Sequence, residues 1–333
     1  MRHSLTRLTA AAVLMLVLPV AKGDPPESSV PGVVRSDGAR ESARDLTRES
    51  SMPSNVGSGQ PSVISLSASR VALEPALAAD LRCRVSAFDQ QLVGAGHYVQ
   101  VASPSGPLVR LELRIGLGDE VVSWLEVRGP QSYWLRRHIP PAPPVLGRVD
   151  LRQVRRQAYD SQDPPPQPET WILAGGIPHL LGALDAHFDF DPLRQDELRF
   201  QPAPGESVAR LPVWIVRGRW KPSYRTQLAG SQEKKGNLRL LPQVPEEVEL
   251  VLGGQQTPFP LFPYRITFWQ QGPPGQPADR APAWRELFSL EFFHVSRHVP
   301  SDPGLFDYEP GDQEVENLTP AYVQRLQRRA IQR

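Results

Sequence analysis

The clearest indication of the fold class is the stretch Leu108-Val109-Arg110-Leu111-Glu112-Leu113-Arg114-Ile115. After the first leucine, apolar residues occupy every second position, and charged residues fill the positions between them. A period of two residues is the pattern of an extended strand, because successive side chains of a strand point to opposite faces. The stretch therefore predicts a β-strand with one buried face and one wet face.

The same alternation recurs along the chain on both sides of this stretch. Leu81, Cys83 and Val85 alternate with polar residues, and short turn sequences separate the segments that follow. Consecutive alternating segments joined by short turns predict antiparallel strands that pair in order. The further expected strands cover residues 97–102, 120–127, 131–139, 207–220, 247–252, 264–270 and 287–295.

A helical period is found in few places. The clearest runs from Ile177 to Phe188, where apolar residues are spaced for one helix face and Pro178 occupies the first turn. Residues 149–159 predict a second helix with a basic face. Residues 320–331 predict a third, with Thr319 as its cap. The fold class expected from these periods is α+β and mainly β.

The N-terminus has the three-part layout of a secretory signal peptide. A basic start with Arg2 and Arg7 precedes an apolar run that ends at Val20, and Ala21 and Gly23 are small residues suited to cleavage. The run is shorter than the ~20 residues that a membrane-spanning helix needs. We therefore expect residues 1–23 to be removed and the mature chain to be periplasmic or otherwise exported. An uncleaved N-terminal anchor is the alternative.

Residues 24–68 are expected to form a disordered linker, and residues 69–333 a single β domain. The linker sequence is rich in Pro, Ser and Gly, and its residues 24–62 contain no aromatic residue, so it cannot bury enough apolar surface to offset the entropy of ordering. From the residues alone, the folded part should begin between about 63 and 76.

Charge and cysteine content exclude several classes of protein. The chain has 37 basic and 36 acidic residues, and loss of residues 1–23 removes three bases and no acid. A mature chain this close to neutral argues against a nucleic-acid partner, which would call for a basic excess. The single cysteine, Cys83, excludes an internal disulfide, so an exported domain of this size must rely on its apolar core.

No constellation of residues points to catalysis. His187 lies near Asp185, Asp189 and Asp191, but a carboxylate cluster at a helix end is more often solvated than metal-binding. Cys83 lies on the apolar face of its strand, where a thiol usually acts as a small apolar side chain. We expect no catalytic residue, no metal and no cofactor, and we expect that the protein is not an enzyme. A hydrolase built around His187 and Asp189 is the weakest alternative.

The chain resembles a known family, the LolA/LppX-like superfamily of periplasmic lipoprotein carriers, in a divergent branch of planctomycete exported proteins. The resemblance lies in the order of short motifs over roughly residues 78–322. They are Leu92-Val93-Gly94-Ala95-Gly96-His97-Tyr98-Val99-Gln100, Val109-Arg110-Leu111-Glu112-Leu113, Tyr133-Trp134-Leu135-Arg136-Arg137, Gly147-Arg148-Val149-Asp150-Leu151, Gly175-Gly176-Ile177-Pro178, Phe262-Pro263-Tyr264-Arg265-Ile266 and Leu305-Phe306-Asp307-Tyr308-Glu309-Pro310.

The resemblance implies a strongly curved antiparallel sheet, an incomplete β-barrel, with a few lid helices over an apolar cavity. It implies a carrier of lipids or lipoproteins, or a sensor of envelope stress. It also implies an arginine that holds the lid closed, although no arginine of this chain can be assigned that role from the sequence.

Two functions are compatible with these expectations. They differ in whether the interior of the domain is hollow or packed. The first is a non-enzymatic binder or carrier of the acyl chains of lipids or lipoproteins, and an unfilled apolar cavity would favour it. The second is an envelope scaffold or sensor with a packed interior, whose partner would be a protein docked on a sheet edge or on residues 325–333. Neither is an integral membrane protein. The expected cavity wall consists of Leu111, Leu113, Trp124 and Trp134 on neighbouring strands, beneath Leu180, Leu184 and Phe188 on the helix.

Overall fold

The computed structural model describes residues 61–87, 90–159, 171–200, 208–229, 244–271, 284–300, 302 and 304–324. The predicted signal peptide, residues 1–23, and most of the predicted linker lie outside this part of the chain. None of the helices in the described part combines the length and the apolar character needed to cross a membrane.

The folded part begins earlier than the predicted boundary between residues 68 and 69. Helix α2 (Val63–Ala72) starts after Ser62, whose hydroxyl accepts the N–H of Ser65 at 3.0 Å. Ile64, Ser67 and Val71 are buried on one side of this helix. Three inward-facing positions anchor the helix, and its start at Val63 lies within the range of about 63–76 expected for the beginning of the folded part.

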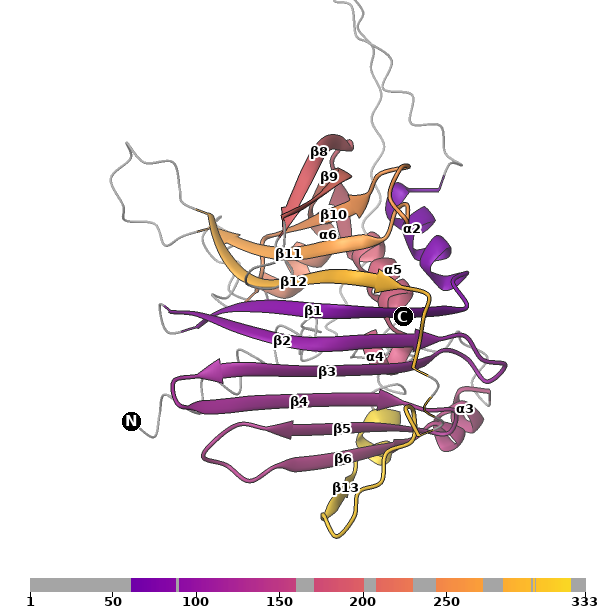
Figure 1. The fold of residues 1–333 in the computed structure, drawn as a ribbon. Coiled ribbons are helices and arrows are strands. Elements are labelled where there is room, and N and C mark those ends of the chain that lie inside the picture. The colour runs from indigo at the N-terminus through magenta and orange to yellow at the C-terminus, as the bar shows by residue number, and fades with distance from the viewer. Residues whose placement is uncertain are drawn as a thin grey trace, which may run out of the picture.

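Among the described residues, thirteen strands form one open, curved sheet (Figure 1). The strand order is β13-β6-β5-β4-β3-β2-β1-β12-β11-β10-β9-β7, and β8 also pairs with β9. All pairs are antiparallel except β13 with β6. The mainly β fold class, with a curved open sheet and few helices, is confirmed.

Two meanders make up most of this sheet. The first contains β1 (Ala76–Ala87), β2 (Gln90–Val101), β3 (Leu108–Leu117), β4 (Glu120–Arg128), β5 (Ser132–His138) and β6 (Val145–Asp150). The second contains β9 (Ala209–Trp220), β10 (Glu247–Gly253), β11 (Pro263–Gln271) and β12 (Trp284–Ser296). β1 pairs with β12 and joins the two. The short strands are β7 (Phe188–Phe190), β8 (Arg194–Phe200) and β13 (Val315–Asn317).

The other helices are α3 (Leu151–Tyr159), α4 (Trp171–Ala174), α5 (Ile177–His187) and α6 (Pro222–Ala229). The helix predicted over 149–159 begins later than expected, because β6 extends to Asp150. Phe188 was predicted on the helix face, but it is the first residue of β7. The predicted C-terminal helix is helical over 319–324, and its remainder lies outside the described residues.

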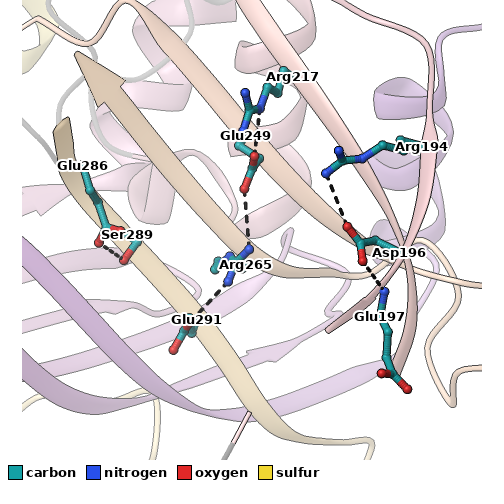
Figure 2. A network of polar contacts seen from close by, with 9 residues as sticks. All are labelled: Arg194, Asp196, Glu197, Arg217, Glu249, Arg265, Glu286, Ser289 and Glu291. Atoms are coloured by element: carbon teal, nitrogen blue, oxygen red, sulfur yellow. Dashed lines mark hydrogen bonds and ion pairs between the residues drawn. The ribbon is translucent and has the colours of Figure 1, made fainter. Parts of the chain in front are cut away.

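The two faces of the sheet differ sharply in polarity. The inner face carries one large apolar core, which α2, α4 and α5 cover from one side (Figure 1). The outer face of the second meander carries a ladder of charges, in which Glu249 pairs with Arg217 at 2.9 Å and with Arg265 at 3.5 Å (Figure 2). Arg265 lies 3.9 Å from Glu291 in turn. The inner face is buried as expected and the outer face is polar here, but it is not uniformly wet, because Glu249 is itself buried.

A C-terminal strap, residues 304–318, covers the outer face of the first meander. The guanidinium of Arg110 donates to the carbonyl of Leu305 at 2.9 Å, and the rings of Trp134 and Tyr308 lie 5.4 Å apart. The strap ends in β13, which pairs with the edge strand β6. It therefore gives this part of the outer face a small apolar cluster of its own.

Candidate binding site between the sheet and helices α4 and α5

Six of the seven residues predicted to line a cavity lie together in the core on the inner face of the sheet. Strand register explains this for the sheet residues, because Leu113 lies directly opposite Trp124 and Leu111 directly opposite Glu126. Side chains at directly opposite positions of antiparallel strands share a face. The six residues are Leu111, Leu113, Trp124, Leu180, Leu184 and Phe188.

Trp134 does not belong to this wall, and its assignment is corrected. It pairs with Val127, which lies one position from Glu126 and therefore on the outer face. There it packs with Val127 and Leu146, beside the Tyr308 of the strap. Its neighbour Tyr133 occupies the inner face instead. Tyr133 and Trp134 are both buried, so the sequence of β5 did not reveal which face of the strand lies towards the helices.

The six wall residues are packed rather than exposed to a hollow. None of them has more than 8 % of its surface exposed. A cavity wide enough for water would leave part of its lining accessible, so the space between these side chains is filled. As the structure stands, the wall is the floor of a core beneath α4 and α5.

Tyr98 links the sheet to the start of α5. Its hydroxyl accepts the N–H of Ile177 at 3.0 Å and donates to Oε1 of Gln100 at 2.6 Å. Gly176, just before the helix, has a φ of 83°, and a side chain there would collide with the Tyr98 hydroxyl. The Leu92–Gln100 motif and the Gly175–Pro178 motif of the sequence therefore meet at this contact.

Arg128 links the sheet to the end of α4. Its Nε donates to the carbonyl of Leu173 at 2.9 Å, and its guanidinium also donates to the carbonyl of Pro107. Burial, and secondarily the nearby charge of Arg155, lower the pKa of Arg128 to about 10. One half-buried cation thus joins β4, the β2–β3 turn and α4.

Glu126 places a buried carboxyl group in the wall itself. Its two oxygens accept hydrogen bonds from Trp124 Nε1 and from the Tyr133 hydroxyl, each at 2.7 Å. Burial raises the pKa of this carboxyl, and the two hydrogen bonds only partly oppose that effect. The core therefore makes the ionised form of this carboxyl less favourable than it is at an exposed position.

A pocket of about 340 Å³ opens at the end of the helical layer. Gln100, the β2–β3 turn and the junction of α4 with α5 line it, and Ala72 of α2 completes its rim. None of the seven predicted lining residues borders it. The sequence-based prediction therefore located a buried wall and missed the pocket beside it.

His187 and Cys83, which were considered for catalysis, have the surroundings of side chains that support the fold. The ring of His187 makes an edge contact with the ring of Tyr224, with 4.3 Å between centroids. Cys83 is fully buried, and burial raises the pKa of its thiol to about 11. In the part of the chain that the structure describes, no group of three or more His, Cys, Asp or Glu residues is placed to hold a metal ion.

Comparison with known proteins gives matches at the level of structure. No family model matches the chain, and neither does any curated protein sequence. One similar structure is a domain provisionally assigned as an outer membrane lipoprotein-sorting protein from Vibrio parahaemolyticus. It is 9 % identical with a TM-score of 0.30, over 74 % of this chain and 94 % of that chain. Another is a DUF1329 family protein from Desulfovibrio piger, 8 % identical with a TM-score of 0.31, over 74 % of this chain and 95 % of that chain. Likenesses this distant carry no argument about ligand or activity.

Proposed function

We propose that this chain is an exported, non-enzymatic binder of lipid or lipoprotein acyl chains, which it holds between the inner face of the sheet and helices α4 and α5. The observation that carries the proposal is the construction of the inner wall. A thin helical layer covers a surface that is apolar except for the carboxyl group of Glu126. Two polar links at one end, Tyr98 to Ile177 and Arg128 to Leu173, tie that layer to the sheet.

Opening of the helical layer would supply the binding space. Because the wall residues are packed in this structure, an acyl chain must replace the contacts that α4 and α5 make with the sheet. Burial of a chain of about 14–16 carbons contributes roughly 11–13 kcal/mol at ~0.8 kcal/mol per methylene, before the entropic cost of association. A contribution of this size can offset the displacement of two short helices.

Arg128 is the residue we assign to holding the layer closed. It reaches the last residues of α4 from the sheet, so its loss would release that end of the layer. The proposal includes this role of Arg128, together with membership in the lipoprotein-carrier superfamily and a location in the envelope.

A second candidate is a scaffold or sensor that binds a protein partner. The packing of all six inner wall residues favours it, since a filled interior needs no ligand. In that case α4 and α5 would stay in place, and an envelope protein would dock on the outside of the molecule.

Titration of the exported chain with a fluorescent fatty acid separates the two. The test variant is Leu113→Arg, at the centre of the wall, and the matched control is Val121→Arg, at an exposed position of β4. We expect saturable binding by the wild type and the control, and lost binding with a weakened but folded Leu113→Arg. Absence of binding by the wild type, or wild-type affinity in a folded Leu113→Arg, would reject the carrier in favour of the scaffold.

A further inference from the structure

The pocket at the α4–α5 junction offers hydrogen-bond donors. Gln100 is only 3 % exposed and lines the pocket. Its Oε1 is occupied by the Tyr98 hydroxyl, so its amide NH₂ is the group left to bond with a ligand. The Nε2 atom of His179 is buried and has no hydrogen-bond partner among the described residues. Buried polar atoms are nearly always partnered in folded proteins. Because Nε2 has almost no accessible surface, the His179 ring would have to turn towards the pocket for this atom to meet a ligand.

A positive charge lies directly behind the same pocket. A side chain at Gly106, which lines the pocket, would meet the guanidinium of Arg128 at 3.3 Å. The hydrogen-bond acceptors of that guanidinium are backbone carbonyls, and no carboxylate is found to stabilise its charge within the described part of the chain. Its field also reaches His179, whose pKa is lowered first by burial and then by Arg128. A half-buried cation without a carboxylate partner favours an anion bound close to it.

An anion in the pocket would satisfy all three groups. It would accept from the Gln100 amide and, in the Nε2–H tautomer, from His179, and it would lie close to the charge of Arg128. The volume of about 340 Å³ exceeds what a lone carboxylate fills and falls at the small end of ligand pockets.

We propose that this pocket binds a phosphate group, with Gln100 and His179 as donors and Arg128 as the charge behind them. The source we favour is the headgroup of a phospholipid, an assignment that rests on the proposed function because the acyl chains would then enter beneath α4 and α5. Free phosphate is the other source of the same chemistry.

Calorimetric titration of the full chain with two probes distinguishes the sources. The probes are inorganic phosphate and dihexanoylphosphatidic acid, which has a phosphate on short acyl chains, and dihexanoylglycerol is the control without phosphate. His179→Leu removes a donor. Ala102→Asp adds a negative charge at an exposed rim position, and Ala102→Asn has nearly the same shape without the charge. Melting temperatures confirm that each variant is folded.

We expect the lipid phosphate to bind the wild type and Ala102→Asn alike, and Ala102→Asp and His179→Leu to weaken it at least tenfold. Equal binding of inorganic phosphate would support the pocket with free phosphate as the source. Failure of both phosphate probes to bind, or unchanged binding by Ala102→Asp, would overturn the inference. Phosphate binding without fatty-acid binding would leave the pocket in place and reject only the acyl-chain carrier.

Discussion

The Nε of Arg128 donates to the carbonyl oxygen of Leu173 at 2.9 Å, and through this bond a sheet residue holds the end of α4. Replacement of Arg128 by Met removes this bond and the bond to Pro107. We expect a loss of about 3–6 kcal/mol in the free energy of unfolding, since hydrogen bonds to charged groups contribute roughly 1.5–3 kcal/mol each.

Hydrogen exchange checks where that loss is located. In Arg128→Met, amides of residues 171–187 should exchange faster, while those of β10 change much less. Arg136→Met, on the outer face of β5, is the matched control. A uniform increase across the whole sheet would show that Arg128 supports the fold in general and does not hold the helical layer.

Two glycines at the start and in the middle of α5 should respond to alanine in opposite ways. Gly176 has a left-handed φ of 83° and faces the Tyr98 hydroxyl, so Gly176→Ala should destabilise the protein by more than ~1 kcal/mol. Gly182 is surrounded by open space, so Gly182→Ala should stabilise it by about 0.5–1 kcal/mol. Urea denaturation measures both. Equal effects of the same sign would contradict the described start of α5.

The buried carboxyl of Glu126 should make stability depend on pH. Its pKa in the folded protein is raised above the ordinary value of 4.5, so the folded state retains a proton that the unfolded chain has already lost. The unfolding free energy should therefore fall as pH rises above 4.5 and through the raised pKa. Glu126→Gln keeps hydrogen-bonding groups beside Trp124 and Tyr133 and should flatten this slope.

Unfolding measured in urea at several pH values tests the Glu126 prediction. Glu120→Gln, at the exposed first position of β4, introduces the same amide outside the core. A slope that is identical in the wild type and Glu126→Gln would mean that this carboxyl is solvated or already ionised.

Cys83 should be inert in the folded protein. Its side chain is fully buried against β2, and burial raises the pKa of the thiol to about 11, which keeps it protonated. Native protein should react with a thiol reagent at least ~100-fold more slowly than unfolded protein. Rapid labelling of the native state would show that β1 opens readily at this point.

Strands β1, β3, β4 and β5 were predictable because one period describes them, whereas β6 was not predicted and β2 begins well before its expected start at residue 97. In β1 and β3 the residues at alternate positions are buried, as the sequence pattern indicated. The error at Trp134 has a different origin. The outer face of β5 is covered by the C-terminal strap, so Tyr133 and Trp134 are both buried, and no local pattern shows that Tyr308 will lie on one of them.

The pocket could not be predicted for a similar reason. Gln100 and Gly106 lie at the end of β2 and in the turn after it, but His179 comes from α5, and no spacing in the sequence connects it with them. Tyr98 and Gly176 stood in motifs noted for their resemblance to the carriers, but only the fold places the hydroxyl against the glycine. Arg128 follows an ordinary strand sequence, and nothing in that sequence marks the α4 carbonyl it reaches.

Native mass spectrometry of the protein, purified without detergent from its native host, tests the acyl-chain proposal most directly. We expect a population heavier than the mature polypeptide by the mass of an acyl lipid. The lipid should dissociate from it on collisional activation. A single species at the polypeptide mass, or one shifted only by a bound protein, would contradict the carrier and support the scaffold.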